Sequence, residues 1–323
     1  MYWIALLVPF IIVVAGLILT LTKRRSSVAV TVGADLRGAA DLGRRRSTRR
    51  LRLALLLIPT LGGVIAAAII ASYRDDTGTD WLLGRTSFLI ITPILVTIVT
   101  VLVMAFVPRF AETVSRRTAE LAVRLPSTYT QHPALATLII AGVLLAASTL
   151  VFGVLALPNG DSLFYFYGHH YAGGGGMFPG FTYGVPVLVS LGLLVAAVWL
   201  SLWRIARGPR PTDNGLREAD AAVRTVTAAA VIAMASFAVA LTLAIVVLMA
   251  SIAFWDVADG GQFDLHGNVV PVNSTAQMLS VLSRCGVGFG IGVIVVANYF
   301  LVHAISSAAG AAYRVSTQEL VDA

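Results

Sequence analysis

Seven long apolar runs constrain this chain more than any other feature. At about 1.5 Å of rise per helical residue, each run is long enough to cross about 30 Å of hydrocarbon. Lipid offers no hydrogen-bond partner to a peptide group, so segments of this kind cross a membrane as helices. We therefore expect an all-α fold, a polytopic transmembrane bundle of about seven spans, at residues 2–22, 53–73, 87–107, 135–157, 182–203, 225–253 and 278–305.

The composition supports a membrane protein with one structural unit. Hydrophobic residues make up 58% of the chain and charged residues only 12%, whereas a soluble domain carries about 25% charged residues. The longest loop, residues 23–52, is too short to fold alone without a metal or disulfides. We expect a single integral membrane domain over residues 1–323, with 23–52 as a basic cytoplasmic loop.

The basic residues predict the orientation of the bundle. All but three of the 23 Lys and Arg residues fall in alternate loops and the C-terminal tail; the exceptions are Arg74, Arg85 and Arg284. Basic loops stay in the cytoplasm. We therefore expect the N-terminus outside and the C-terminus in the cytoplasm of a cell (inner or plasma) membrane. The uncharged start, Met1-Tyr2-Trp3, lacks the basic region of a cleavable signal peptide, so the first span is expected to be retained.

The tryptophans agree with these spans. Each lies near a predicted helix end, where an indole ring prefers the headgroup layer: Trp3, Trp81, Trp199, Trp203 and Trp255.

The 23–52 loop contains the densest group of positive charges. These arginines are predicted to contact anionic lipid headgroups of the inner leaflet: Arg44, Arg45, Arg46, Arg49 and Arg50. The alternative is that they only fix the topology. Nucleic-acid binding is not expected, because the loop is short, tethered to the membrane and lacks interleaved aromatic residues.

The predicted outer loop 158–181 combines histidines, aromatic residues and four consecutive glycines. His169 and His170, with His266 from the next outer loop, are predicted ligands for a transition metal. The aromatic residues are an alternative binding wall for an apolar ligand. A third interpretation is an interfacial aromatic segment with a flexible glycine hinge at 173–176.

The last span carries more polar groups than the others. Arg284, Asn298, Tyr299 and His303 are predicted ligand-binding residues, because an ionisable group inside a span is often functional. At 100° per residue, Arg284, Gly288, Gly292, Tyr299 and His303 form one stripe, with Asn298 beside it. Arg284 is expected to bind an anion or to pair with Asp256, Asp259 or Asp264. The alternative is snorkelling of Arg284 to the outer headgroups.

Glycines in the same span indicate close helix packing. Gly286 and Gly290 form one pair at a spacing of four residues, and Gly288 and Gly292 form a second pair on another face. Such pairs let helix backbones approach each other in lipid. We expect packing inside the chain, with the alanine-rich sixth run (residues 228–244) as neighbour; homodimerisation is the alternative.

The sequence predicts no particular chemistry. Apart from Arg284, the spans contain no Asp, Glu, Lys or Arg, so there are no carboxylates for ion-coupled transport. Cys285 is the single cysteine, so no internal disulfide forms. The sequence identifies no particular cofactor, and it favours a non-enzymatic protein while an enzyme stays open as an alternative.

Three functions remain open at this point. The first is a non-enzymatic accessory or permease-like subunit with membrane or cytoplasmic partners. The second is a membrane sensor or enzyme that binds a ligand or metal at its outer face. The third is a stand-alone facilitator.

Overall fold

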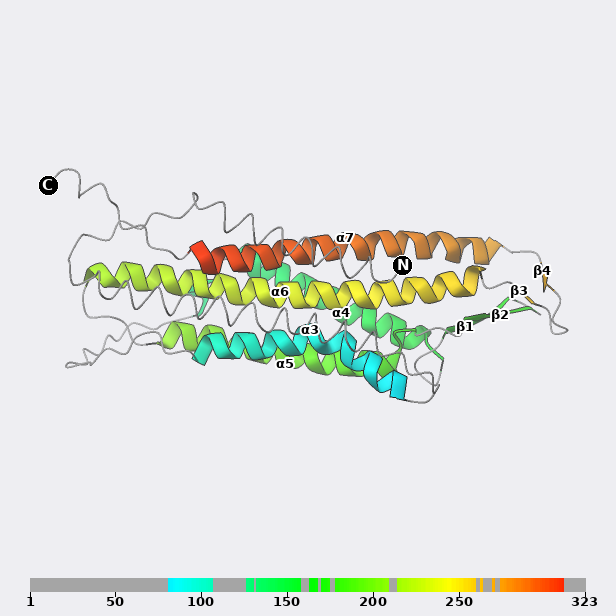
Figure 1. Cartoon of the computed structure of the whole chain (residues 1–323), viewed down its shortest axis with the longest axis horizontal. Helices are drawn as coiled ribbons and strands as arrows, with labels where there is room; N and C mark the ends of the chain where they lie inside the picture. Colours follow the sequence, from blue (N-terminus) through cyan, green and yellow to red (C-terminus); the bar gives the residue numbers. More distant parts are fainter. Residues whose placement is uncertain are drawn as a thin grey trace.

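The computed structural model describes residues 81–106, 126–130, 132–157, 163–167, 170–174, 178–208, 214–259, 262–263, 269–270 and 274–310. Within them the chain forms the helices α3 (Trp81–Phe106), α4 (His132–Leu155), α5 (Phe181–Arg207), α6 (Asn214–Asp259) and α7 (Ser274–Gly310), with a 3-10 turn, η1 (Pro126–Tyr129). The helices lie side by side along the long axis of the molecule (Figure 1). The predicted spans 2–22 and 53–73 lie outside the described residues.

Four helical segments are long and apolar enough to cross a membrane: His132–Leu155, Phe181–Arg207, Thr227–Ala258 and Gln277–Val302. A shorter apolar helical segment, Ile90–Ala105, lies in α3. These segments coincide with the last five predicted spans, so the helical prediction is confirmed for this part of the chain. The boundaries differ most at α6, which begins at Asn214 instead of residue 225 and is the longest described helix, as predicted.

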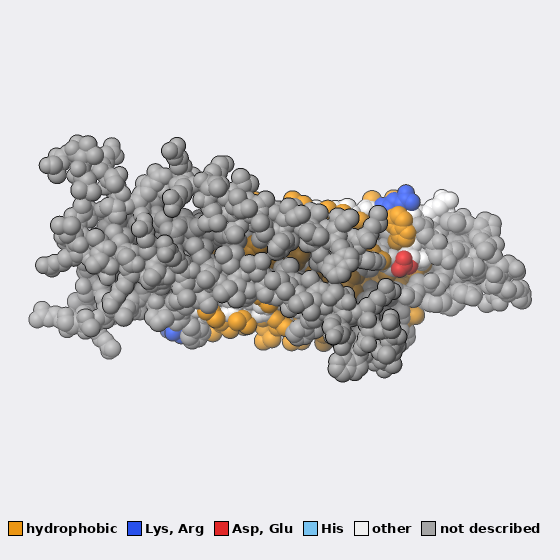
Figure 2. All heavy atoms as spheres, in the orientation of Figure 1, with side chains coloured by type: hydrophobic (Ala, Val, Ile, Leu, Met, Phe, Trp, Pro, Cys, Tyr) orange, Lys and Arg blue, Asp and Glu red, His pale blue; other side chains and the backbone are white. Residues whose placement is uncertain are grey.

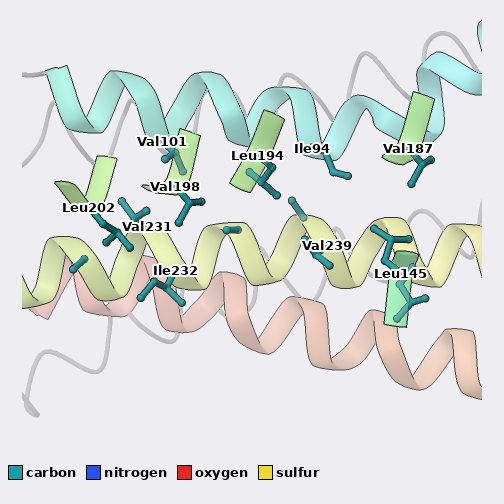
Figure 3. Close-up of a cluster of buried hydrophobic side chains, with 14 of the residues drawn as sticks. Ile94, Val101, Leu145, Val187, Leu194, Val198, Leu202, Val231, Ile232 and Val239 are labelled. Atoms are coloured by element: carbon teal, nitrogen blue, oxygen red, sulfur yellow. The ribbon is translucent and has the colours of Figure 1, made fainter. Parts of the chain in front are cut away.

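Helix α6 is the centre of the described bundle and contacts α3, α4, α5 and α7. Every residue from Val231 to Ala240 is buried. Many of these side chains are alanines, which let neighbouring helices approach closely in lipid. Around α6 a core of branched aliphatic side chains gathers from α3, α4 and α5 (Figure 3): Ile94, Val101, Leu145, Val187, Leu194, Val198 and Leu202.

The outward faces of the bundle are apolar too. Val154 on α4 is 76% exposed, and Val195 on α5 is 63% exposed. In Figure 2, hydrophobic side chains fill the middle of the visible described surface, and charged atoms lie toward its ends. A surface of this kind is stable against lipid chains, whereas in water it would aggregate.

A small antiparallel sheet lies at one end of the helical bundle and was not part of the all-α prediction (Figure 1). The strands β1 (Leu163–Tyr167), β2 (His170–Gly174), β3 (Gln262–Phe263) and β4 (Val269–Val270) pair in the order β1-β2-β3-β4. The sequence of β1 is rich in aromatic residues, which favour strands. Two residues separate β1 from β2, a spacing typical of a hairpin.

The predicted glycine hinge lies partly within this sheet. Gly173 pairs with Phe164, and Gly174 pairs with Leu163. A flexible hinge is therefore wrong for these two glycines, because strand pairing fixes their backbone.

The last helix packs on α6 through glycines. A Cβ atom at Gly286 would overlap the Ser251 hydroxyl, and one at Gly290 would lie 2.7 Å from the Leu248 Cγ. By contrast, Gly288 and Gly292 face open space. The prediction that a glycine pair packs inside the chain, against the sixth run, is confirmed for Gly286 and Gly290. The partner positions, Ala244, Leu248 and Ser251, lie at the end of the predicted alanine-rich stretch and just beyond it.

Candidate functional site

Arg284 lies on the exposed side of α7, about two helical turns past the start of the apolar segment Gln277–Val302. Its guanidinium carbon lies 5.3 Å from the ring centroid of Trp255 on α6, a cation–π contact between the two helices. Among the described side chains Arg284 has no ion-pair partner, although Asp256 is exposed beside Trp255. The side chains of Asp259 and Asp264 lie outside the described ones.

The other predicted ligand-binding residues of α7 do not form one compact group with Arg284. At about 1.5 Å per residue, Asn298 lies about 21 Å from Arg284 along the helix. Its amide Nδ2 donates a hydrogen bond to the Ile294 carbonyl (2.8 Å), and the side chain is buried. Tyr299 is 66% exposed. His303 lies in α7, but its side chain is outside the described ones. One small ligand therefore cannot contact both Arg284 and Asn298.

The predicted metal ligands lie mostly beyond the described residues. His169 and His266 are outside them, and His170 begins β2, with its side chain not described. The described residues contain no group of three potential metal ligands. The predicted headgroup arginines (Arg44, Arg45, Arg46, Arg49 and Arg50) also lie outside the described residues.

Arg224 is a residue whose role the sequence did not indicate. It is 1% exposed and stands among the largest fully buried side chains. Its Nη1 donates hydrogen bonds to the carbonyl oxygens of Ile205 (2.7 Å) and Ala206 (3.4 Å) at the end of α5. The last carbonyls of a helix lack intrahelical partners and carry partial negative charge. Arg224 of α6 therefore caps α5, although the sequence placed it in a basic loop.

A second arginine at this end of the bundle points outward. On α5, the Arg207 guanidinium carbon lies 4.3 Å from the centroid of the Trp203 ring. Trp203 in turn stacks on Trp199, with ring centroids 6.4 Å apart and an interplanar angle of 25°. The only sequence signal was the spacing of four residues between these three side chains, which places them on one helix face.

Comparison with known proteins found no matching family model, no similar curated protein and no similar solved structure.

The two arginine–tryptophan pairs lie at opposite ends of the bundle. Arg224 contacts the end of α5, whereas Trp255 contacts Arg284, and residues 224–255 of α6 cover about 46 Å at about 1.5 Å per residue. A bilayer including its headgroup layers is about 40–45 Å thick. The separation of the two pairs is thus close to the thickness of a bilayer with its headgroup layers, in which arginine and tryptophan side chains are favoured.

Neutralising Arg284 should cost little stability. An exposed cation–π contact contributes about 0.5–1 kcal/mol. We expect Arg284→Gln to lower the free energy of unfolding by less than about 1 kcal/mol, measured by denaturant titration in mild detergent. A much larger loss would mean that Arg284 also locks the neighbouring loop through an ion pair.

Proposed function

We propose that this chain is a non-enzymatic, multi-pass membrane subunit, of accessory or permease-like type, that works with another membrane protein. The observation that carries the proposal is the direction of the polar and small residues of α7. Gly288 and Gly292 face open space, and Tyr299 is exposed. Arg284 is exposed as well, although its guanidinium also lies over the Trp255 ring of α6. The core beside α6 is largely aliphatic, although it also buries hydroxyl side chains such as Ser236 and Thr242.

This arrangement favours a lateral partner over a stand-alone facilitator. A facilitator for a charged solute would place ionisable side chains around its path inside the bundle, whereas the charged residue among the described buried ones, Arg224, caps α5. An outward polar face in lipid is unfavourable unless another helix or a headgroup contacts it. The open space at Gly288 and Gly292 supports contact with a helix, because glycines permit close backbone approach. Arg284 and Tyr299 are the residues that we expect to contact the partner.

The basic residues support the orientation that goes with this function. Arg204, Arg207 and Arg224 lie at one end of the described bundle, and Arg284 lies at the other. With the arginine-rich loops in the cytoplasm, the N-terminus lies outside and the β1–β4 sheet faces the outside of the cell membrane.

Native mass spectrometry of the gently solubilised full chain, expressed in its own host, tests this proposal. We expect a second protein to be retained at a fixed stoichiometry. Filling the open face with Gly288→Leu and Gly292→Leu should reduce its retention at least about ten-fold, equivalent to about 1.4 kcal/mol. Gly192→Leu on α5 is the matched control, because Gly192 also faces open space, and it should leave retention unchanged. A chain without any partner, or equal losses in both variants, would contradict the proposal.

A second candidate function draws on the sheet. Tyr171 of β2 pairs with Phe263 of β3, so the two loops that contain His169, His170 and His266 are joined by strand pairing. This favours an outer-face ligand- or metal-binding protein as the alternative. In the same spectra, a bare chain that carries a metal or a discrete small ligand would support that candidate.

A further inference from the structure

We infer that the end of α5 is a binding site for the phosphate group of an anionic membrane lipid, built by Trp199, Trp203 and Arg207. The inference does not depend on the proposed function, because it concerns a different helix and a lipid instead of a protein partner.

The three side chains form a continuous exposed ladder. They are spaced by four residues and so share one face of α5. Trp199 is 63% exposed, Trp203 is half-buried and Arg207 is exposed. The Trp199 and Trp203 rings stack on each other, and the Arg207 guanidinium carbon lies 4.3 Å from the Trp203 ring centroid. This contact orders a side chain that is otherwise flexible, which reduces the entropy lost when a ligand binds.

The charge of Arg207 is available to an anion. Its guanidinium contacts the Trp203 ring, and among the described side chains it has no ion-pair partner. The nearby carbonyls of Ile205 and Ala206 accept hydrogen bonds from Arg224. A guanidinium that contacts an indole ring can still donate from its other N–H groups, and its planar fork matches two phosphate oxygens.

The depth and the apolar surroundings favour a lipid over free phosphate. The apolar segment Phe181–Arg207 ends at this arginine, so the guanidinium lies at the headgroup layer. Toward the bilayer centre, Trp199 is followed by exposed aliphatic residues, among them Val195 at 63%. These surfaces would contact an acyl chain while Arg207 contacts the phosphate. Inorganic phosphate has no group to cover them.

The opposite end of the bundle supplies an internal comparison. Arg284 also lies over a tryptophan, Trp255, but the exposed carboxylate of Asp256 follows that tryptophan directly. An acidic neighbour disfavours an anionic headgroup. We therefore expect anionic lipid to bind more tightly at the Arg207–Trp203 site than at the Arg284–Trp255 site.

The test is a lipid titration of the purified full chain, followed by native mass spectrometry, with phosphatidylglycerol as the anionic lipid and phosphatidylcholine as the neutral one. A basic residue near an anionic headgroup contributes enough that its loss should weaken binding about five-fold. We expect Arg207→Gln to weaken phosphatidylglycerol binding by this factor and to leave phosphatidylcholine binding unchanged. Trp203→Leu, which removes the ring beneath the guanidinium, should weaken it in the same direction.

Two comparisons make the test decisive. Arg284→Gln removes an arginine with the same kind of contact, and it should leave phosphatidylglycerol binding within two-fold of wild type, since about two-fold is less than the effect of one headgroup contact. Added inorganic phosphate should not displace the lipid. Equal losses from Arg207→Gln and Arg284→Gln would show a general charge effect and overturn the inference. Displacement by inorganic phosphate would also overturn it, in favour of a free-phosphate site.

Discussion

Replacing Arg224 with methionine is expected to lower the free energy of unfolding by about 3 kcal/mol. Methionine fills a similar volume but donates no hydrogen bond. The Ile205 and Ala206 carbonyls, which now accept hydrogen bonds from Arg224, would lose their buried charged donor. A buried carbonyl without a partner costs about 1–3 kcal/mol. Favourable interaction of the cation with the helix dipole would be lost as well. Denaturant titration of the purified protein in mild detergent, followed by tryptophan fluorescence, measures the change.

Arg207→Met is the matched control for this prediction. It makes the same chemical change at the same end of the bundle, but Arg207 is exposed and stacked on Trp203. We expect it to cost less than about 1 kcal/mol. Arg224→Lys, which keeps a positive charge and a donor, should recover part of the stability. If Arg224→Met unfolds at the denaturant concentration of the wild type, the capping role is wrong.

The role of Arg224 was not predictable from charge counting. The positive-inside pattern assigns a residue to a side of the membrane and carries no information about depth or burial. The polar start of α6 between Asn214 and Asp220 also hid the helix, because only the apolar part of a span differs from a loop in hydropathy. The sequence therefore placed Arg224 in a loop, whereas the helix extends ten residues before it and carries it beside the end of α5.

The apolar runs predicted the helices better than the charge pattern predicted the role of Arg224, and the reason is physical. Within lipid a peptide group must find its partner in its own helix, so a long apolar run leaves the chain little choice. This constraint ends at the headgroup layer. The paired strands at Leu163–Tyr167 and His170–Gly174 lie beyond the apolar segments, where turn length and side-chain pairing decide the structure.

On α7 the stripe of polar and small residues was predictable from the sequence, but the side of the helix bundle that it faces was not. Helical periodicity grouped Arg284, Gly288, Gly292 and Tyr299 on one face, and all four are exposed. Hydropathy cannot distinguish an interior polar face from an outward one, because in a membrane both neighbours are apolar. That choice depends on which glycine pair fits the neighbouring helix, here Gly286 and Gly290 against α6.

Valine at Gly290 is expected to lower the free energy of unfolding by about 2 kcal/mol, and valine at Gly292 to change it by less than about 0.5 kcal/mol. At Gly290 a Cβ would lie 2.7 Å from Leu248 Cγ, 2.9 Å from Leu248 Cδ2 and 3.5 Å from the Ala244 carbonyl oxygen. The leucine branch is close to its own backbone and the carbonyl belongs to the helix, so neither can move far. Valine adds two further methyl groups, which would force α6 and α7 apart.

The pair of variants separates packing from helix propensity. Both positions lie inside α7, two residues apart, so the exchange of glycine for valine changes the intrinsic helix preference equally. At Gly292 nothing lies within 4 Å of the added Cβ. The difference between the two unfolding free energies, measured on the purified chain in mild detergent, therefore reports the contact between α6 and α7. Equal values would mean that this contact does not hold the two helices together, and that the close glycine approach has no energetic role.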